Sequence, residues 1–150
     1  MSGSATLPLA QLSIRADTQE TRRASRWLVA AADANRVPSD ATIRLDHCLD
    51  EALANVIAHG GPAATASPIE LQFAVRRKPG ACTADLILLY DGVAFDPSRH
   101  EPRSRPANLE EASLGGLGLL MLRHFADALE YGHSDGRNRL TITVSWVEAT

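Results

Sequence analysis

The clearest hydrophobic pattern in the chain predicts a long helix that follows a turn at residues 35–38. Its apolar positions recur at the spacing of one helix face, at Leu45, Leu49, Ala52, Leu53 and Val56. This stripe should face a hydrophobic core. Beside it, Glu51, Asn55 and His59 are four residues apart and should share one polar stripe. An acid, an amide and an imidazole in line at the edge of a core indicate the wall of a pocket.

The other patterns predict two further helices and several strands. Period-two alternation or apolar runs indicate strands near residues 12–16, 69–75, 86–90 and 140–146. Asp17 and Glu20 form a capping box that should open a helix before the turn. Another apolar helix should run from the glycines at 115–118 to Asp127, and the segment from Gly60 to Pro68 is expected to end the long helix and form a loop. The strand at 86–90 should be central, covered on both faces or on one face and an edge.

Composition and charge limit the classes of function. A length of 150 residues and 45% hydrophobic residues fit one globular domain. A net charge of −3 argues against a surface that coats nucleic acid. Cys48 and Cys82 lack metal-ligand spacing and indicate ordinary thiols in a reducing compartment. Neither a signal peptide nor a long apolar span is visible, so we expect a cytoplasmic protein with no membrane and no direct nucleic-acid partner.

A glycine-rich turn, Gly115-Gly116-Leu117-Gly118, precedes the third helix. Such a turn leaves backbone N–H groups free for an anion, although a plain helix start or a hinge explains it equally well. Met121 stands where the dinucleotide fingerprint needs its last glycine, and no Gly-Lys-Ser/Thr follows as in a P-loop. The long segment 98–113 before it has no periodicity, which is typical of lids, binding loops or disordered segments.

The polar stripe of the long helix has two interpretations. A carboxylate at Glu51 can orient a hydroxyl or a water, and an amide oxygen at Asn55 suits Mg²⁺. Taken alone, Glu51 and Asn55 are better explained as exposed helix residues, and His59 as a partner of the helix dipole near its C-terminus. Asp91-Gly92 after the central strand is a tight turn by default.

The order of these motifs favours the functional interpretations over the structural ones, because it resembles the order found in the GHKL ATPases. The closer resemblance is to the small anti-sigma-factor serine kinases of bacterial partner switching. The matching residues are Glu51, Ala52, Asn55 and His59 for the N-box, Gly92, Phe95, Asp96 and Pro97 for the first glycine box, Gly115, Gly116, Gly118, Leu119 and Asp127 for the second, and Asn138 before the last strand. The resemblance spans roughly residues 10–147.

The resemblance implies one α/β domain over residues 1–150, an α+β two-layer sandwich with a mixed, mostly antiparallel sheet and helices on one face. Residues 1–8 would be frayed and 98–114 would form an ATP lid. Glu51 would be the catalytic base or orienting group, and Asn55 would bind Mg²⁺. ATP would contact Asn55, His59, Tyr90, Asp91, Gly92, Phe95, Gly115, Gly116, Leu117, Gly118 and Leu119. One of Arg99, Arg103 or Arg105 would reach the phosphates.

The same resemblance implies an activity and its partners. The protein would transfer the γ-phosphate of ATP to a serine of an anti-anti-sigma factor with a STAS domain. It would also sequester a sigma factor and form a homodimer. Two alternatives are a non-catalytic binding module and a sensor-kinase ATPase domain that phosphorylates a histidine. The second is disfavoured because no dimerisation hairpin or acceptor-histidine domain accompanies this chain.

One position departs from the family pattern. The first glycine box resembles Asp-x-Gly, and its Asp binds the adenine amino group, but Tyr90 stands two residues before Gly92. Asp91 is one residue out of register and should therefore face the other side of its strand. Either Asp91 takes the role through a local bulge, or Tyr90 reshapes the adenine site, or nucleotide binding is weakened.

Overall fold

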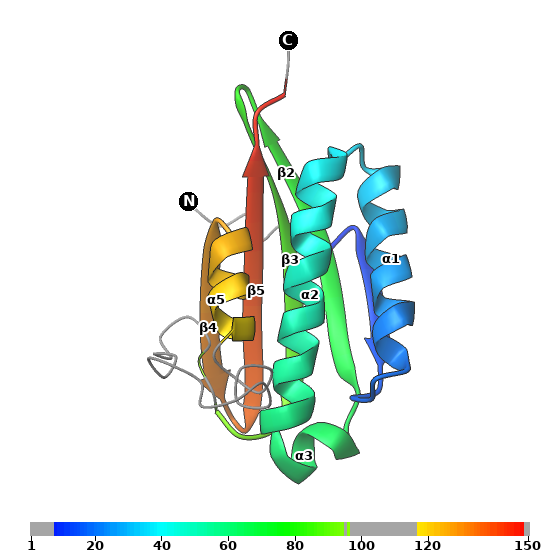
Figure 1. Ribbon diagram of the computed structural model, residues 1–150, viewed down its shortest axis with the longest axis vertical. Coiled ribbons are helices and arrows are strands. Elements are labelled where there is room, and N and C mark those ends of the chain that lie inside the picture. Colours follow the sequence, from blue (N-terminus) through cyan, green and yellow to red (C-terminus); the bar gives the residue numbers. More distant parts are fainter. Residues whose placement is uncertain (1–7, 95, 97–116, 149–150) are drawn as a thin grey trace.

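Helices cover one face of a five-stranded antiparallel sheet in the computed structural model, which describes residues 8–94, 96 and 117–148 (Figure 1). The strands are β1 (Ala10–Ile14), β2 (Ile69–Lys78), β3 (Ala81–Asp91), β4 (Ala128–Ser134) and β5 (Arg137–Trp146). They are ordered β1-β2-β3-β5-β4, and each pair of neighbours is antiparallel. The helices are α1 (Glu20–Ala34), α2 (Ser39–His59), α3 (Gly61–Ala66) and α5 (Leu117–Phe125). The predicted fold class is confirmed.

The long helix α2 lies across the middle of the sheet and supplies most of the helical part of the core (Figure 1). Its predicted apolar stripe is buried, with Leu45, Leu49 and Leu53 fully inaccessible to water. Each such side chain contributes roughly 1.5–3 kcal/mol by leaving water. Cys48 lies in the same buried stripe with its Sγ 3.9 Å from the Leu122 carbonyl oxygen, and burial raises the pKa of its thiol to about 12. It therefore stays protonated and unreactive at neutral pH.

The central strand β3 is covered on one face only by the helices that the structure describes. Leu86, Leu88 and Tyr90 alternate toward the helices and are buried, whereas Ile87 and Leu89 lie half-buried on the opposite face. β3 is the middle strand of the sheet, as expected, and of the two expected arrangements the described residues show cover by helices on one face and not on both. Cross-strand neighbours on β2 and β5 shield this second face, which explains how it tolerates an unbroken apolar sequence.

Two elements were not anticipated from the sequence. The expected loop after α2 contains the short helix α3, which begins at Gly61 with a φ of +78° and has Pro62 in its first turn. The edge strand β4 pairs with β5 through a tight turn at Asp135 and Gly136, both with positive φ. An Asp-Gly pair between strands is a recognised hairpin signal, so this turn could have revealed β4.

The predicted start of α1 is confirmed in outline. Asp17 accepts a hydrogen bond from the Glu20 backbone N–H at 2.9 Å, as a capping residue should. The Glu20 carboxylate reaches back to the Arg15 N–H at 3.2 Å instead of to Asp17. Among the helices described, none is long and apolar enough to cross a membrane.

Candidate functional site

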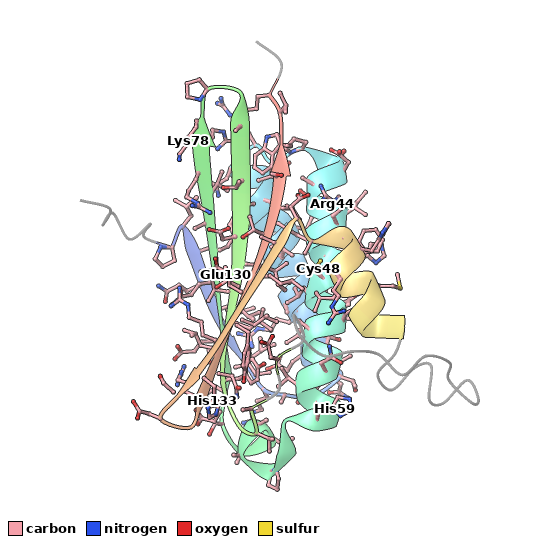
Figure 2. The ribbon with its side chains drawn as sticks, turned by 90° about the vertical axis from the view of Figure 1, so that its left-hand side faces the viewer. Arg44, Cys48, His59, Lys78, Glu130 and His133 are labelled. Carbon is pink, nitrogen blue, oxygen red and sulfur yellow. The ribbon has the colours of Figure 1, made fainter. Side chains whose placement is uncertain are left out.

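A small pocket lies between the C-terminal half of α2 and the adjoining ends of β3 and β5. It is lined by Ala52, Asn55, Val56, His59, Gly60, Tyr90, Val93 and Leu140. Its free volume is about 10 Å³, which is roughly the room that one water molecule needs. Figure 2 shows His59 on α2 and His133 on β4 at this end of the molecule. The helical spacing therefore placed Asn55 and His59 correctly on a pocket wall.

Asn55 carries an unsatisfied polar group at this wall. Its side-chain nitrogen is buried and has no hydrogen-bond partner among the residues that the structure describes. A buried polar atom left unpaired costs about 1–3 kcal/mol, so such groups are usually paired with a ligand, an ion or water. A half turn of the amide exchanges its nitrogen and oxygen, and the oxygen is a hard ligand that suits Mg²⁺. Asn55 thus fits a role in holding a magnesium–phosphate group.

Glu51 lies one helical turn before Asn55 on the same stripe and is half-buried. Its carboxylate forms no hydrogen bond or ion pair with any described residue. Within the described ranges, no group of three histidine, cysteine, aspartate or glutamate residues gathers to hold a metal. A cation beside Asn55 would therefore depend on oxygens from a bound nucleotide, which is the usual way Mg²⁺ binds in phosphoryl-transfer sites.

The strand β3 presents Tyr90 to the pocket and Asp91 to the opposite face. Tyr90 is 6% exposed, whereas the Asp91 carboxylate lies 3.9 Å from the Arg137 guanidinium. Pairing between β3 and β5 continues without interruption through Tyr90 with Asn138 and Asp91 with Arg137. The register leaves no place for the bulge that would bring Asp91 into the pocket. Of the alternatives drawn from the sequence, the geometry favours a pocket reshaped by Tyr90.

The phenol of Tyr90 is a neutral group in this setting. Burial raises the pKa of Tyr90 far above its ordinary value, and the neighbouring Tyr131 and Asp96 add to the effect. The hydroxyl therefore keeps its proton throughout the physiological range. It fills the pocket as an aromatic side chain and not as a charged one.

The turn after β3 approaches α2 so closely that it requires glycine. Gly92 has a φ of +133°, and a Cβ there would lie 2.5 Å from the Gly60 carbonyl oxygen. The Val93 N–H donates to the same oxygen at 3.1 Å. The turn at Gly92 and Val93 thus packs against the end of α2 at the pocket.

Asn138 holds this turn from the neighbouring strand. It is fully buried, and its Nδ2 donates to the carbonyl oxygens of Tyr90 and Gly92, each at 3.3 Å. Its Oδ1 accepts a hydrogen bond from the Tyr131 hydroxyl. In the sequence, Asn138 matches the family pattern only by its position before the last strand. In the structure its side chain links β3, β4 and β5 at the pocket.

Replacing Asn138 by alanine should destabilise the protein by about 1–3 kcal/mol. The reason is that two buried carbonyl oxygens and the Tyr131 hydroxyl lose their shared partner. Urea denaturation of the variant and the unmodified protein measures the loss. Asn35→Ala is the matched control, because the Asn35 side chain donates one hydrogen bond, to the Ala31 carbonyl oxygen within α1, and links no strands. Equal losses for the two variants would contradict this role of Asn138.

Arg44 fixes the end of α5 against α2 and the sheet. Its Nε donates to the Phe125 carbonyl oxygen at 3.1 Å, and its Nη2 lies 2.9 Å from the Asp127 carboxylate. Asp127 also accepts from the Ser145 N–H at 2.6 Å. Burial favours the neutral acid, but the hydrogen bonds from Ser145 and Arg44 outweigh it and hold the pKa of Asp127 below its ordinary value. In this structure Asp127, matched above to the second glycine box, is an anchor of α5.

The remaining predicted contacts fall on residues or side chains outside those described. Phe95, Gly115 and Gly116 and the three candidate arginines of the lid lie outside the described residues. Leu117, Gly118 and Leu119 form the start of α5, of which the backbone alone is described. The expected boundaries of the frayed terminus and of the lid also fall mostly in these segments.

The fold and the pocket define a histidine kinase-like ATPase domain, and the chain belongs to that family, whose model matches residues 14–144. It is 32% identical over 133 residues to the serine/threonine-protein kinase BtrW of Bordetella bronchiseptica, covering 89% of each chain. The resemblance to the partner-switching serine kinases is thereby confirmed.

Two solved structures share the fold at low sequence identity. One contains the RsbU and RsbW domains of a Mycobacterium tuberculosis protein, with a TM-score of 0.59, 18% identity and 91% coverage of this chain. This chain spans 32% of that protein. The other is the SiaB–SiaC complex of Pseudomonas aeruginosa, with a TM-score of 0.54, 14% identity and coverage of 93% of this chain and 91% of that one.

Proposed function

We propose that this protein is an ATP-dependent protein-serine kinase that phosphorylates an anti-anti-sigma partner with a STAS domain and sequesters a sigma factor. The observation that carries the proposal is the buried side-chain nitrogen of Asn55, which lines the pocket without a hydrogen-bond partner among the described residues, one turn after the half-buried Glu51. Family membership and the kinship with BtrW, which is named a serine/threonine-protein kinase, support it.

Each of these residues would have a separate role in phosphoryl transfer. Asn55, together with phosphate oxygens, would hold Mg²⁺, which neutralises charge on the transferred phosphoryl group when bound. Glu51 would accept the proton of the partner's serine hydroxyl, whose oxygen forms the new bond to the γ-phosphorus. The bond from that phosphorus to the bridging oxygen breaks, and ADP leaves. The backbone N–H groups of Gly115, Gly116 and Gly118 would cradle the phosphates. Positioning and charge neutralisation would supply most of the rate.

Phosphorylation would decide which partner the protein holds. A phosphoserine adds a charge of about −1.5 to −2 to the interface, which would expel the phosphorylated partner from an overall acidic protein. The released kinase would then hold the sigma factor away from RNA polymerase. The homodimer that the family resemblance implies belongs to the same proposal.

A second candidate is a non-catalytic binding module that sequesters its partner without ATP turnover. The filled pocket beside Tyr90 favours it, since little free volume remains there. The placement of Glu51 and Asn55 on one stripe opposes it, because a binding surface alone needs neither a base nor a magnesium ligand.

Addition of Mg²⁺-ATP should raise the melting temperature of the purified protein. Ligand at a hundred times its Kd stabilises by roughly 2.7 kcal/mol, which corresponds to about 5–10 °C at roughly 2–4 °C per kcal/mol for a domain of this size. Asn55→Ala should weaken the shift, whereas Asn35→Ala, at the far end of α1, should retain it. A protein that shows no shift at millimolar Mg²⁺-ATP or Mg²⁺-ADP would fit the binding module instead.

A further inference from the structure

Tyr90 forms part of the wall of the pocket beside Asn55. It is only 6% exposed, and the free volume that remains is about 10 Å³. That is the space of roughly one water molecule. A purine has nine heavy atoms in its fused rings alone and does not fit into such a space.

Hydrogen bonds hold the backbone around Tyr90 in place. Asn138 donates to the carbonyl oxygens of Tyr90 and Gly92, and the Val93 N–H donates to the Gly60 carbonyl oxygen. The ladder between β3 and β5 is continuous at this point. Among the described residues, a rotation of the Tyr90 side chain would enlarge the pocket most directly, and it would expose a large aromatic surface to water.

The rest of the pocket offers a base few polar partners. Its inner wall is apolar at Ala52, Val56 and Leu140. The nearest carboxylate along the strand, Asp91, faces the other side of the sheet near Arg137. The polar side of the pocket is the α2 stripe with Asn55 and the exposed His59, so phosphates and a cation would lie at this open side and not in the small space beside Tyr90.

We propose that Tyr90 is a specificity-determining residue that keeps the base out of this pocket, so that the protein recognises the magnesium–triphosphate group and discriminates little between bases. This inference rests on the proposed function. It widens the class of phosphate donor from ATP to nucleoside triphosphates in general. The base would remain outside the pocket, in contact with water.

Calorimetric titration of three ligands tests this assignment. Mg²⁺-ATP, Mg²⁺-GTP and Mg²⁺-tripolyphosphate should bind the unmodified protein with Kd values within a few-fold of one another. Tyr90→Phe keeps the ring and should behave in the same way. Tyr90→Asp and Tyr90→Ser remove the ring, so both should bind ATP roughly tenfold or more tightly than tripolyphosphate, because a buried base then finds space and a hydrogen-bond partner. If the carboxylate introduced by Tyr90→Asp impairs folding, Tyr90→Ser still tests the proposal.

The possible outcomes separate this inference from the proposed function. If the unmodified protein already prefers ATP over tripolyphosphate by tenfold or more, and Tyr90→Ser abolishes the preference, Tyr90 holds the base and the inference is overturned while the kinase proposal stands. Unchanged ratios in both ring-deleted variants would overturn it as well. If none of the ligands binds any of the four proteins, both proposals fail together.

Discussion

Glu51→Gln should lower the rate of serine phosphorylation by about 10²- to 10⁴-fold, the usual contribution of a general base. Glutamine keeps the shape of the side chain but cannot accept the proton of the serine hydroxyl. Because the Glu51 carboxylate has no hydrogen bond or ion pair with described residues, its loss should leave the fold intact. Single-turnover transfer of labelled γ-phosphate to the STAS-domain partner measures the rate, and calorimetry checks that Mg²⁺-ATP and the partner still bind.

Asp50→Asn provides the matched control for this experiment. It removes the same charge one residue earlier on α2, about 100° away around the helix and on an exposed position. The control should keep most of the phosphorylation rate. If Glu51→Gln loses partner binding together with activity, Glu51 is part of the docking surface and not the base.

Gly92→Ala should destabilise the protein by about 3 kcal/mol or more. The strained backbone accounts for roughly 1–3 kcal/mol, since Gly92 has a φ of +133° that residues with a Cβ rarely adopt. The contact of the new Cβ with the Gly60 carbonyl oxygen, 2.5 Å away, adds to this cost. The melting temperature should therefore fall by about 6–12 °C, at roughly 2–4 °C per kcal/mol.

The same substitution elsewhere in the sheet shows whether the effect is local. Gly132 on β4 has no atom within 4 Å of an added Cβ, so Gly132→Ala should leave the melting temperature nearly unchanged. Similar shifts for the two variants would mean that the turn after β3 can relax away from α2. Nucleotide titration of Gly92→Ala at a temperature where it stays folded then separates stability from binding.

The part of the site that lies on α2 could be predicted because a helix period is a local property of the sequence. The spacing of Leu45, Leu49 and Leu53 fixed the buried face, and the same period placed Asn55 and His59 beside it. No knowledge of the neighbouring strands was needed. The period of two along β3 likewise set Tyr90 and Asp91 on opposite faces.

The parts that could not be predicted depend on pairing between distant strands. The Asn138 side chain donates a hydrogen bond to the carbonyl oxygen of Tyr90, 48 residues away in the sequence. No sequence pattern near either residue predicts that contact. The strand β4 was missed because Glu130, Gly132 and His133 interrupt its apolar positions, as is typical of an edge strand with exposed side chains. The volume of the pocket depends on the packing of Tyr90 and follows from the coordinates alone.

The position of β5 in the sheet also determines when the pocket can form during translation. Asn55 and Tyr90 leave the ribosome first, but the strand that carries Asn138 and Leu140 follows about 48 residues behind Tyr90. At roughly 5–20 residues per second, this interval lasts about 2–10 s. During it, β3 has an unpaired edge and its apolar side chains lack one neighbour. Nascent chains of this protein should therefore depend on chaperones at that stage, and the pocket beside Asn55 is complete only when β5 has been synthesised.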